Sequence, residues 1–327
     1  MLNLSRAVPT RRALLAGAAA ATLPVAVRAQ GYPSGPVRII VGFGAGGLAD
    51  LTVRLVGEQL SRRLGQQVVV DNRPGAGGSV AARAAASAEP DGHTLMVLST
   101  GNAINRSLFR TLPYDPIADF TAITAMVSFD LVLLAAVNAH IRTVADMLAA
   151  GRNGGRLVIA TISPGSTQNL AAEWLRVAAG LEATVVPYRT TPEVLTAVQR
   201  GDADLAFESF AAARGALDGG PLRAVASTGE RRSALLPDVP TLREGGLPDY
   251  AVTGWNALFA PARTPRPVVT LLNRHVTEIL AQPDIRTRLL GLGVEPLANT
   301  PEEMDRLLRE DIALWARIIE RAGIERQ

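Results

Sequence analysis

The chain contains no cysteine and no lysine among its 327 residues, and it has only three histidines. Without cysteine there is no disulfide, thiol nucleophile, zinc–thiolate site or lipid-anchored cysteine. Without lysine there is no P-loop lysine and no Schiff base, which excludes pyridoxal phosphate chemistry. His93, His140 and His275 are too widely spaced for a local metal-binding motif. The residues therefore predict no metal and no cofactor.

Long apolar runs are also scarce, and the longest of them lies at the N-terminus. Residues 1–29 carry Arg11-Arg12, then the apolar stretch Ala13–Val27, and a small-residue cleavage pattern at Val27–Ala29. This order predicts a cleaved secretory leader. The arginine pair favours twin-arginine export, with an ordinary Sec leader as the alternative. Because the leader holds four arginines and no acid, its removal takes the formal net charge from +3 to −1, and no nucleic-acid partner is predicted.

Strand-like and helix-like segments alternate through the rest of the chain, a pattern that predicts an α/β fold with mostly parallel sheets. The expected strands are Val37–Val41, Gln67–Val70, Thr94–Leu98, Phe120–Met126, Leu131–Val137, Leu157–Ile159, Ala183–Val186, Leu205–Phe207 and Ala224–Ala226. The expected helices are Leu48–Leu64, Val80–Ser87, Val144–Ala150, Thr167–Ala179, Glu193–Arg200 and Val268–Ala281. A last helix should start at the capping box of Thr300–Glu303 and end at Gly323.

The glycine-rich turn after the first strand fits two different functions. Gly42-x-Gly44-x-x-Gly47 has the spacing of a dinucleotide fingerprint, and Asp71 stands near the place of a ribose-binding acid. The same turn suits an anion receptor, because glycines expose backbone N–H groups and the following helix N-terminus favours negative charge. Against the dinucleotide, Asp71 comes late after Gly47 and no side chains indicate hydride transfer. An exported NAD(P)-dependent oxidoreductase nevertheless remains the alternative.

Several short motifs together resemble one family, the substrate-binding receptors of tripartite tricarboxylate transporters, also called Bug receptors. They occur in the family's order over nearly the whole chain: Pro36–Asp50 (PVRIIVGFGAGGLAD), Asp71–Gly78 (DNRPGAGG), Ala88–Leu95 (AEPDGHTL), Leu112–Phe120 (LPYDPIADF), Val186–Arg189 (VPYR) and Ala234–Thr241 (ALLPDVPT). The resemblance implies a periplasmic protein with the two-lobed, type II periplasmic-binding-protein fold and a ligand cleft between the lobes. It implies capture of a small carboxylate for membrane permease subunits, without catalysis. A receptor that serves a signalling sensor would look the same.

The expected lobes follow from the proline- and glycine-rich joints of the sequence. The chain is expected to leave the first lobe near Thr124–Asp130 and to return near Tyr250–Trp255, so that residues 30–127 and 253–327 form lobe 1 and residues 128–252 form lobe 2. The resemblance places ligand contacts on a loop of each lobe and at nearby strand ends. These expected contacts are Phe43, Gly44, Ala45, Gly46, Gly47, Asp50, Thr100, Asn102, Gly165, Ser166, Thr167, Gln168, Asn169, Arg189 and Glu208.

Five of these residues have a second interpretation. Phe43 could form a wall of the site or part of the core. Asp50 and Ser166 could serve the first turns of their helices through exposed N–H groups. Arg189 could clamp a carboxylate in a bidentate manner or be solvated. Glu208 stands where the family usually has aspartate, which in amino-acid-binding relatives can meet the ligand's ammonium group, and its greater length puts that contact in doubt.

Overall fold

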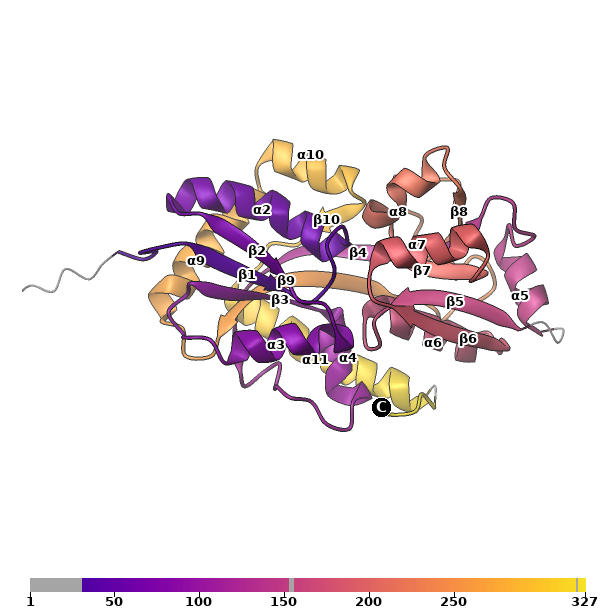
Figure 1. Ribbon diagram of the computed structural model, residues 1–327, viewed down its shortest axis with the longest axis horizontal. Coiled ribbons are helices and arrows are strands. Elements are labelled where there is room, and N and C mark those ends of the chain that lie inside the picture. Colours follow the sequence, from indigo (N-terminus) through magenta and orange to yellow (C-terminus); the bar gives the residue numbers. More distant parts are fainter. Residues whose placement is uncertain (1–30, 153–155, 322) are drawn as a thin grey trace, which may run out of the picture.

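The computed structural model describes residues 31–152, 156–321 and 323–327, and the predicted leader lies outside them. Its strands form two sheets that share one long strand, β4 (Phe120–Ala136). Figure 1 shows the two groups of elements side by side, with β4 and β9 (Thr253–Pro261) between them. The chain has the mixed α/β architecture that the alternating pattern predicts.

The first sheet combines N-terminal and C-terminal segments in the order β2-β1-β3-β9-β4. Its other strands are β1 (Val37–Val41), β2 (Val68–Asn72), β3 (Thr94–Ser99) and β10 (Val294–Pro296). Side chains alternate across it: Leu95 and Val97 pack with α2 and α9, whereas Met96 and Leu98 pack with α3 and α11. The helices around this sheet are α2 (Leu48–Leu64), η1 (Ala76–Gly78), α3 (Ser79–Ala86), α4 (Thr100–Leu108), α9 (Arg266–Leu280), α10 (Pro283–Gly291) and α11 (Pro301–Arg321).

The second sheet contains the end of β4 together with β5 (Leu157–Ile162), β6 (Ala183–Tyr188), β7 (Leu205–Ser209) and β8 (Leu222–Ser227). Four helices accompany it: α5 (Val144–Arg152), α6 (Thr167–Ala178), α7 (Thr191–Arg200) and α8 (Phe210–Leu217). Leu170 and Leu175 of α6 pack on one face with Phe207, while Val194 and Val198 of α7 pack on the other. Both faces are therefore buried.

The sequence predicts two separate strands where the structure has the single strand β4. It pairs with β9 from Phe120 to Asp130 and with β7 from Leu131 to Leu134, without a break. The prediction of mostly parallel sheets is also wrong, because β4 is antiparallel to β7, β8, β9 and β10. The sequence prediction missed β9, β10, α4, α8 and α10, and it placed the other elements within a few residues of their observed ends.

The predicted C-terminal helix is confirmed as α11. The N–H of Thr300 donates to the Glu303 carboxylate (2.9 Å), and the N–H of Glu303 donates to the Thr300 hydroxyl (3.2 Å), which forms the expected capping box. Met304 and Leu308 are buried against the first sheet and α4, and Trp315 is buried with its ring edge-to-face on Trp174 of α6. The apolar stripe of this helix therefore belongs to the core.

Candidate ligand-binding cleft

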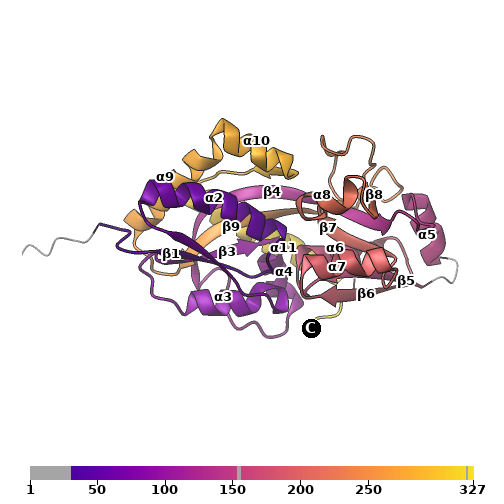
Figure 2. The same cartoon turned by 45° about the horizontal axis from the view of Figure 1, so that its top comes forward.

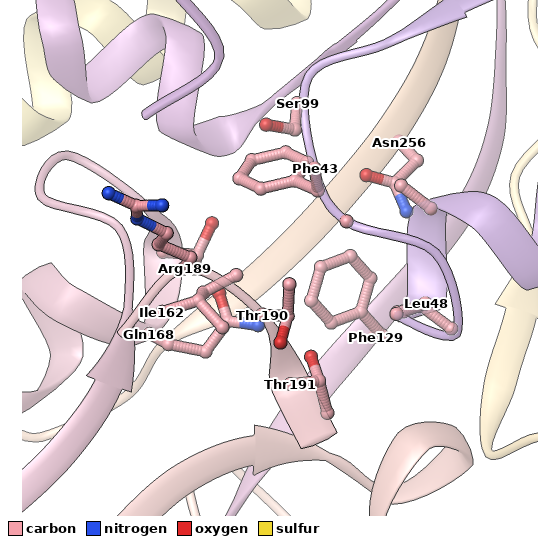
Figure 3. Close-up of a pocket in the computed structure, with 14 residues that line it drawn as sticks. Phe43, Leu48, Ser99, Phe129, Ile162, Gln168, Arg189, Thr190, Thr191 and Asn256 are labelled. Atoms are coloured by element: carbon pink, nitrogen blue, oxygen red, sulfur yellow. The ribbon is translucent and has the colours of Figure 1, made fainter. Parts of the chain in front are cut away.

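A small cavity lies where the two sheets meet, and both sheets contribute to its wall (Figure 3). The space in it that is open to the centre of a water molecule is about 30 Å³. The cavity is lined by Phe43, Gly44, Gly47, Leu48, Ala49, Ser99, Phe129, Ile162, Thr167, Gln168, Arg189, Thr190, Thr191 and Asn256.

Helix N-termini converge on this cavity from both sides. Helices α2, α6 and α7 begin at Leu48, Thr167 and Thr191, and all three residues line the cavity. Helix α4 begins directly after Ser99, another lining residue. The first N–H groups of a helix have no partner within it and carry the positive end of the helix dipole. The cavity is therefore suited to an anion, and Figure 2 shows these four helices near the junction of the sheets.

At three positions in and next to the loop at residues 43–47, the local structure explains why the residue is glycine. A Cβ on Gly42 would lie 2.7 Å from the Cα of Gly78, and one on Gly44 would lie 2.8 Å from Thr190 Cγ2 across the cavity. Gly46 has a φ of +81°, which favours glycine. Phe43, Gly44 and Gly47 line the cavity, whereas Ala45 and Gly46 do not. Close packing therefore accounts for Gly42 and Gly44, and backbone conformation accounts for Gly46.

Asp50 is buried one turn into α2 and does not line the cavity. Its carboxylate accepts hydrogen bonds from the Gly46 N–H (3.0 Å) and the Arg54 guanidinium (3.0 Å). Burial raises the pKa of this carboxyl, but the hydrogen bonds from Arg54 and Gly46 outweigh burial and leave it below its usual value. Asp50 is thus an ionised group that holds the loop in place, and Arg54 balances its charge.

The loop at residues 163–169 is built around the start of α6. Ser166 Oγ accepts from the Asn169 N–H (3.1 Å), and Asn169 Oδ1 accepts from the Gly165 N–H (3.2 Å). Thr167 and Gln168 line the cavity, whereas Gly165, Ser166 and Asn169 lie outside it. The three outer residues shape the turn that presents the other two.

Glu208 is fully buried behind the cavity wall. Its Oε1 accepts from Gln168 Nε2 (2.9 Å) and from the Ser209 N–H (2.9 Å), and its Oε2 accepts from Thr191 Oγ1 (2.7 Å). Burial is the main cause that leaves the pKa of this carboxyl above its usual value, although the three donors oppose that rise. Glu208 therefore reaches the cavity only through Gln168 and Thr191.

Of the other three expected contacts, one lies at the edge of the cavity and two lie behind its wall. Arg189 lines the cavity, but its side chain is exposed at one edge and points away from Phe129 (Figure 3). Thr100 is buried, and its hydroxyl accepts from the Trp255 N–H (2.9 Å). Asn102 is also buried; it accepts from the Ser99 N–H (2.9 Å) and donates to the Tyr114 hydroxyl (2.8 Å). Thr100 and Asn102 therefore support the wall without reaching the cavity.

Sequence reasoning missed more than half of the lining residues. Asn256 is the most informative of them, because its side chain is only 2% exposed and brings a polar amide to the cavity. It lies on β9, a strand that the sequence pattern did not reveal. Thr190 and Thr191 adjoin Arg189, so a correct start for α7 would have identified them. The remaining missed residues are Leu48, Ala49, Ser99, Phe129 and Ile162.

The structure gives no support to the dinucleotide interpretation. Asp71 pairs with Arg73 (2.8 Å) on the outer strand β2 and does not line the cavity. Within residues 31–152, 156–321 and 323–327, no three His, Asp or Glu side chains gather as a metal site. In the same ranges, no helix has the length and apolar character needed to cross a membrane.

The family model described as "Tripartite tricarboxylate transporter family receptor" matches residues 52–324. A curated relative from Pseudomonas sp. strain P51, "UPF0065 protein in tcbD-tcbE intergenic region", is 34% identical over 314 residues and covers 94% of each chain. The resemblance that the sequence motifs predicted is confirmed by these matches.

Solved structures give the same result. "R. palustris Rpa4515 with adipate" has a TM-score of 0.87 and 32% identity over 90% of this chain and 99% of that one. The malate-bound MatC from Rhodopseudomonas palustris has a TM-score of 0.83 and 33% identity over 88% of this chain and 100% of that one. The periplasmic binding protein BugD has a TM-score of 0.85 and 29% identity over 90% of this chain and 100% of that one. The predicted two-lobed periplasmic-binding-protein fold is confirmed.

Proposed function

Because the chain belongs to the tripartite tricarboxylate transporter receptor family, we propose that it binds a small carboxylate in the cleft and delivers it to the permease subunits of such a transporter. The observation that carries this proposal is the convergence of the α2, α6 and α7 N-termini on one cavity. Adipate and malate, named with two of its structural relatives, are ligands of the same chemical class.

The proposed lobes are residues 30–127 with 253–327, and residues 128–252. This division is supported by β4, which changes from the first sheet to the second between Asp130 and Leu131. It is also supported by β9, which returns to the first sheet at Thr253. Thr228 connects the crossing segments, because its hydroxyl accepts from the Leu131 N–H (2.8 Å) and donates to the Val252 carbonyl (2.6 Å). We take Thr228 as the hinge point.

Binding proceeds in two steps under this proposal. The carboxylate first meets the free N–H groups of Leu48 and Ala49 in the open protein. Lobe 2 then closes and brings Thr167, Gln168 and Thr190 onto the other end of the ligand. The ligand shifts the open–closed equilibrium by its greater affinity for the closed form, and the permease recognises that form.

The proposed ligand contacts are the predicted residues that line the cavity, with the polar lining residues of β9 and α7 added. They are Phe43, Gly44, Gly47, Thr167, Gln168, Arg189, Asn256, Thr190 and Thr191. No covalent chemistry is assigned to them, and we propose a receptor without catalytic activity. Export to the periplasm follows from the predicted leader at residues 1–29, which ends in a cleavage pattern and carries no cysteine for lipidation.

A thermal-shift screen of residues 30–327 tests the proposal. The panel holds small dicarboxylates, monocarboxylates, amino acids, aromatic acids and NAD(P). A ligand present at a hundred times its Kd adds about 2.7 kcal/mol to the free energy of unfolding. Stabilisation by a carboxylate is the expected result. Stabilisation by NAD(P) alone would instead revive the oxidoreductase alternative.

A further inference from the structure

The lobe 2 side of the cleft contains a buried carboxyl group, that of Glu208. The Glu208 carboxylate accepts hydrogen bonds from three residues, each at the start of a different helix. Gln168 lies in the first turn of α6, Thr191 opens α7, and Ser209 is the N-cap of α8. The positive ends of three helices therefore converge on one buried carboxyl group.

This arrangement uses up hydrogen-bond donors that would otherwise face the ligand. Thr191 and Gln168 line the cavity, but the Thr191 hydroxyl proton and one amide proton of Gln168 are directed at Glu208. What Thr191 retains for a ligand is the acceptor capacity of its oxygen, and Gln168 retains its carbonyl oxygen and one N–H. The hydroxyls of Thr167 and Thr190, which also line this side, can donate or accept.

The hydrogen-bond donors left free for a ligand differ between the two sides of the cleft. On lobe 1, the acid nearest the start of α2 is Asp50, and its charge is balanced by Arg54 at 2.9 Å. The first N–H groups of α2 are therefore free to hold an anion, and α2 has no side-chain cap. On lobe 2, the ionisable groups are buried Glu208, exposed Arg189 at the edge, and exposed Glu193, whose carboxylate accepts from the Arg189 N–H (3.0 Å).

We propose that the ligand is a monocarboxylate whose far end carries a hydrogen-bond donor, such as an amide, hydroxyl or ammonium group, in place of a second carboxylate. Glu208 is the specificity-determining residue, and it acts through Thr191 and Gln168 without touching the ligand. This inference rests on the proposed function, because it assumes that the first carboxylate occupies the N-terminus of α2.

The test uses a series of acids that differ only at the far end. With three methylenes the series is glutarate, glutaramate, 4-aminobutanoate and pentanoate, whose far ends are a carboxylate, an amide, an ammonium and a methyl group. The two- and four-methylene series are measured in the same way by titration calorimetry on residues 30–327. At the best length, we expect the amide or ammonium acid to bind at least tenfold more tightly than both the dicarboxylate and the methyl acid.

Two variants test whether Glu208 is the cause of the preference against the dicarboxylate. Glu208→Gln keeps the size and an acceptor oxygen but replaces the other oxygen by an NH2 donor, and it should reduce the discrimination against glutarate at least fivefold. Glu193→Gln removes a charge at the exposed edge and should leave the discrimination unchanged. If Glu208→Gln does not fold, as judged by circular dichroism, Thr191→Val serves instead; it should abolish the preference for glutaramate over pentanoate.

The inference is overturned if glutarate binds as tightly as glutaramate, or if these variants leave the ratios unchanged. It is also overturned if no acid of the three series binds. In that last case a hit with another carboxylate in the thermal-shift screen would leave the proposed function standing, whereas no carboxylate hit at all would remove both.

Discussion

Substitution of Gly165 by alanine should hold the lobes apart. Gly165 has a φ of +78°, and a Cβ there would collide with Asn105 Oδ1 and lie 2.9 Å from Phe109 Cε2. Both neighbours belong to the proposed lobe 1, whereas Gly165 belongs to lobe 2. The collision therefore exists only when the lobes are together, and separation of the lobes relieves it.

The size of the effect follows from two separate costs. Left-handed backbone at a non-glycine residue costs about 1–2 kcal/mol, and this cost applies to open and closed forms alike. An extra methyl group in a packed contact costs about 1–3 kcal/mol, and here it applies only to the closed form. Because this second cost applies only to the closed form, it corresponds to about 5- to 150-fold weaker apparent affinity.

Gly201 provides a matched control in the same lobe. Its φ is +80°, nearly equal to that of Gly165, but a Cβ there would meet nothing within 4 Å. Gly201→Ala should therefore lower the melting temperature without changing the Kd measured by titration calorimetry. Gly165→Ala should lower the affinity and increase the radius of gyration of the liganded protein in small-angle scattering. Equal Kd values for the two variants would refute the assignment of this contact to lobe closure.

Three further predictions concern the cleft, the hinge and α11. Asn256→Ala should weaken carboxylate binding at least tenfold with little change in melting temperature, whereas unchanged calorimetric affinity would mean that the amide does not contact the ligand. Thr228→Val removes a buried hydroxyl that links Leu131 to Val252, and chemical denaturation should show a loss of about 1–3 kcal/mol. Asp311 accepts from Trp255 Nε1 (2.6 Å), and burial is the main cause that raises its pKa to about 6. The folded state therefore binds this proton more tightly than the unfolded state, so the free energy of unfolding should fall by about 2–3 kcal/mol from pH 4 to pH 6 through this group. Asp311→Asn should flatten that part of the pH profile, and an unchanged slope would exclude Asp311 as its source.

Features decided by neighbouring residues could be predicted from the sequence. Strand β1 and helix α2 have their predicted bounds, because an apolar run, a glycine turn and an amphipathic segment follow one another directly. The capping box of α11 is equally local. The start of α7 was misplaced at Glu193, because Pro192 resembles a break although proline is well tolerated in the first turn.

Features decided by pairing across the chain could not be predicted. Residues 253–261 form strand β9 because they pair with β3 and β4, which lie more than 100 residues earlier in the chain. Asn256 enters the cleft only through that pairing. The position of Glu208 after a strand suggested an exposed ligand contact, but three donors from α6, α7 and α8 enclose its carboxylate. Sequence position gives the end of a strand, and only packing shows which side chains remain accessible there.

The contact between the lobes explains how weak helix-end charges can select a ligand. Part of the contact between the lobes is made by backbone: a Cβ on Gly77 would lie 2.5 Å from the Pro164 carbonyl oxygen, and one on Gly101 would lie 2.9 Å from the Gly165 carbonyl oxygen. In the proposed closed form, the helix N-termini would therefore act on the carboxylate at a lower dielectric than in open solvent. In the open protein, water would screen the same N–H groups. Glycines far from the ligand therefore contribute to affinity, because they allow the closure that makes the electrostatic attraction strong.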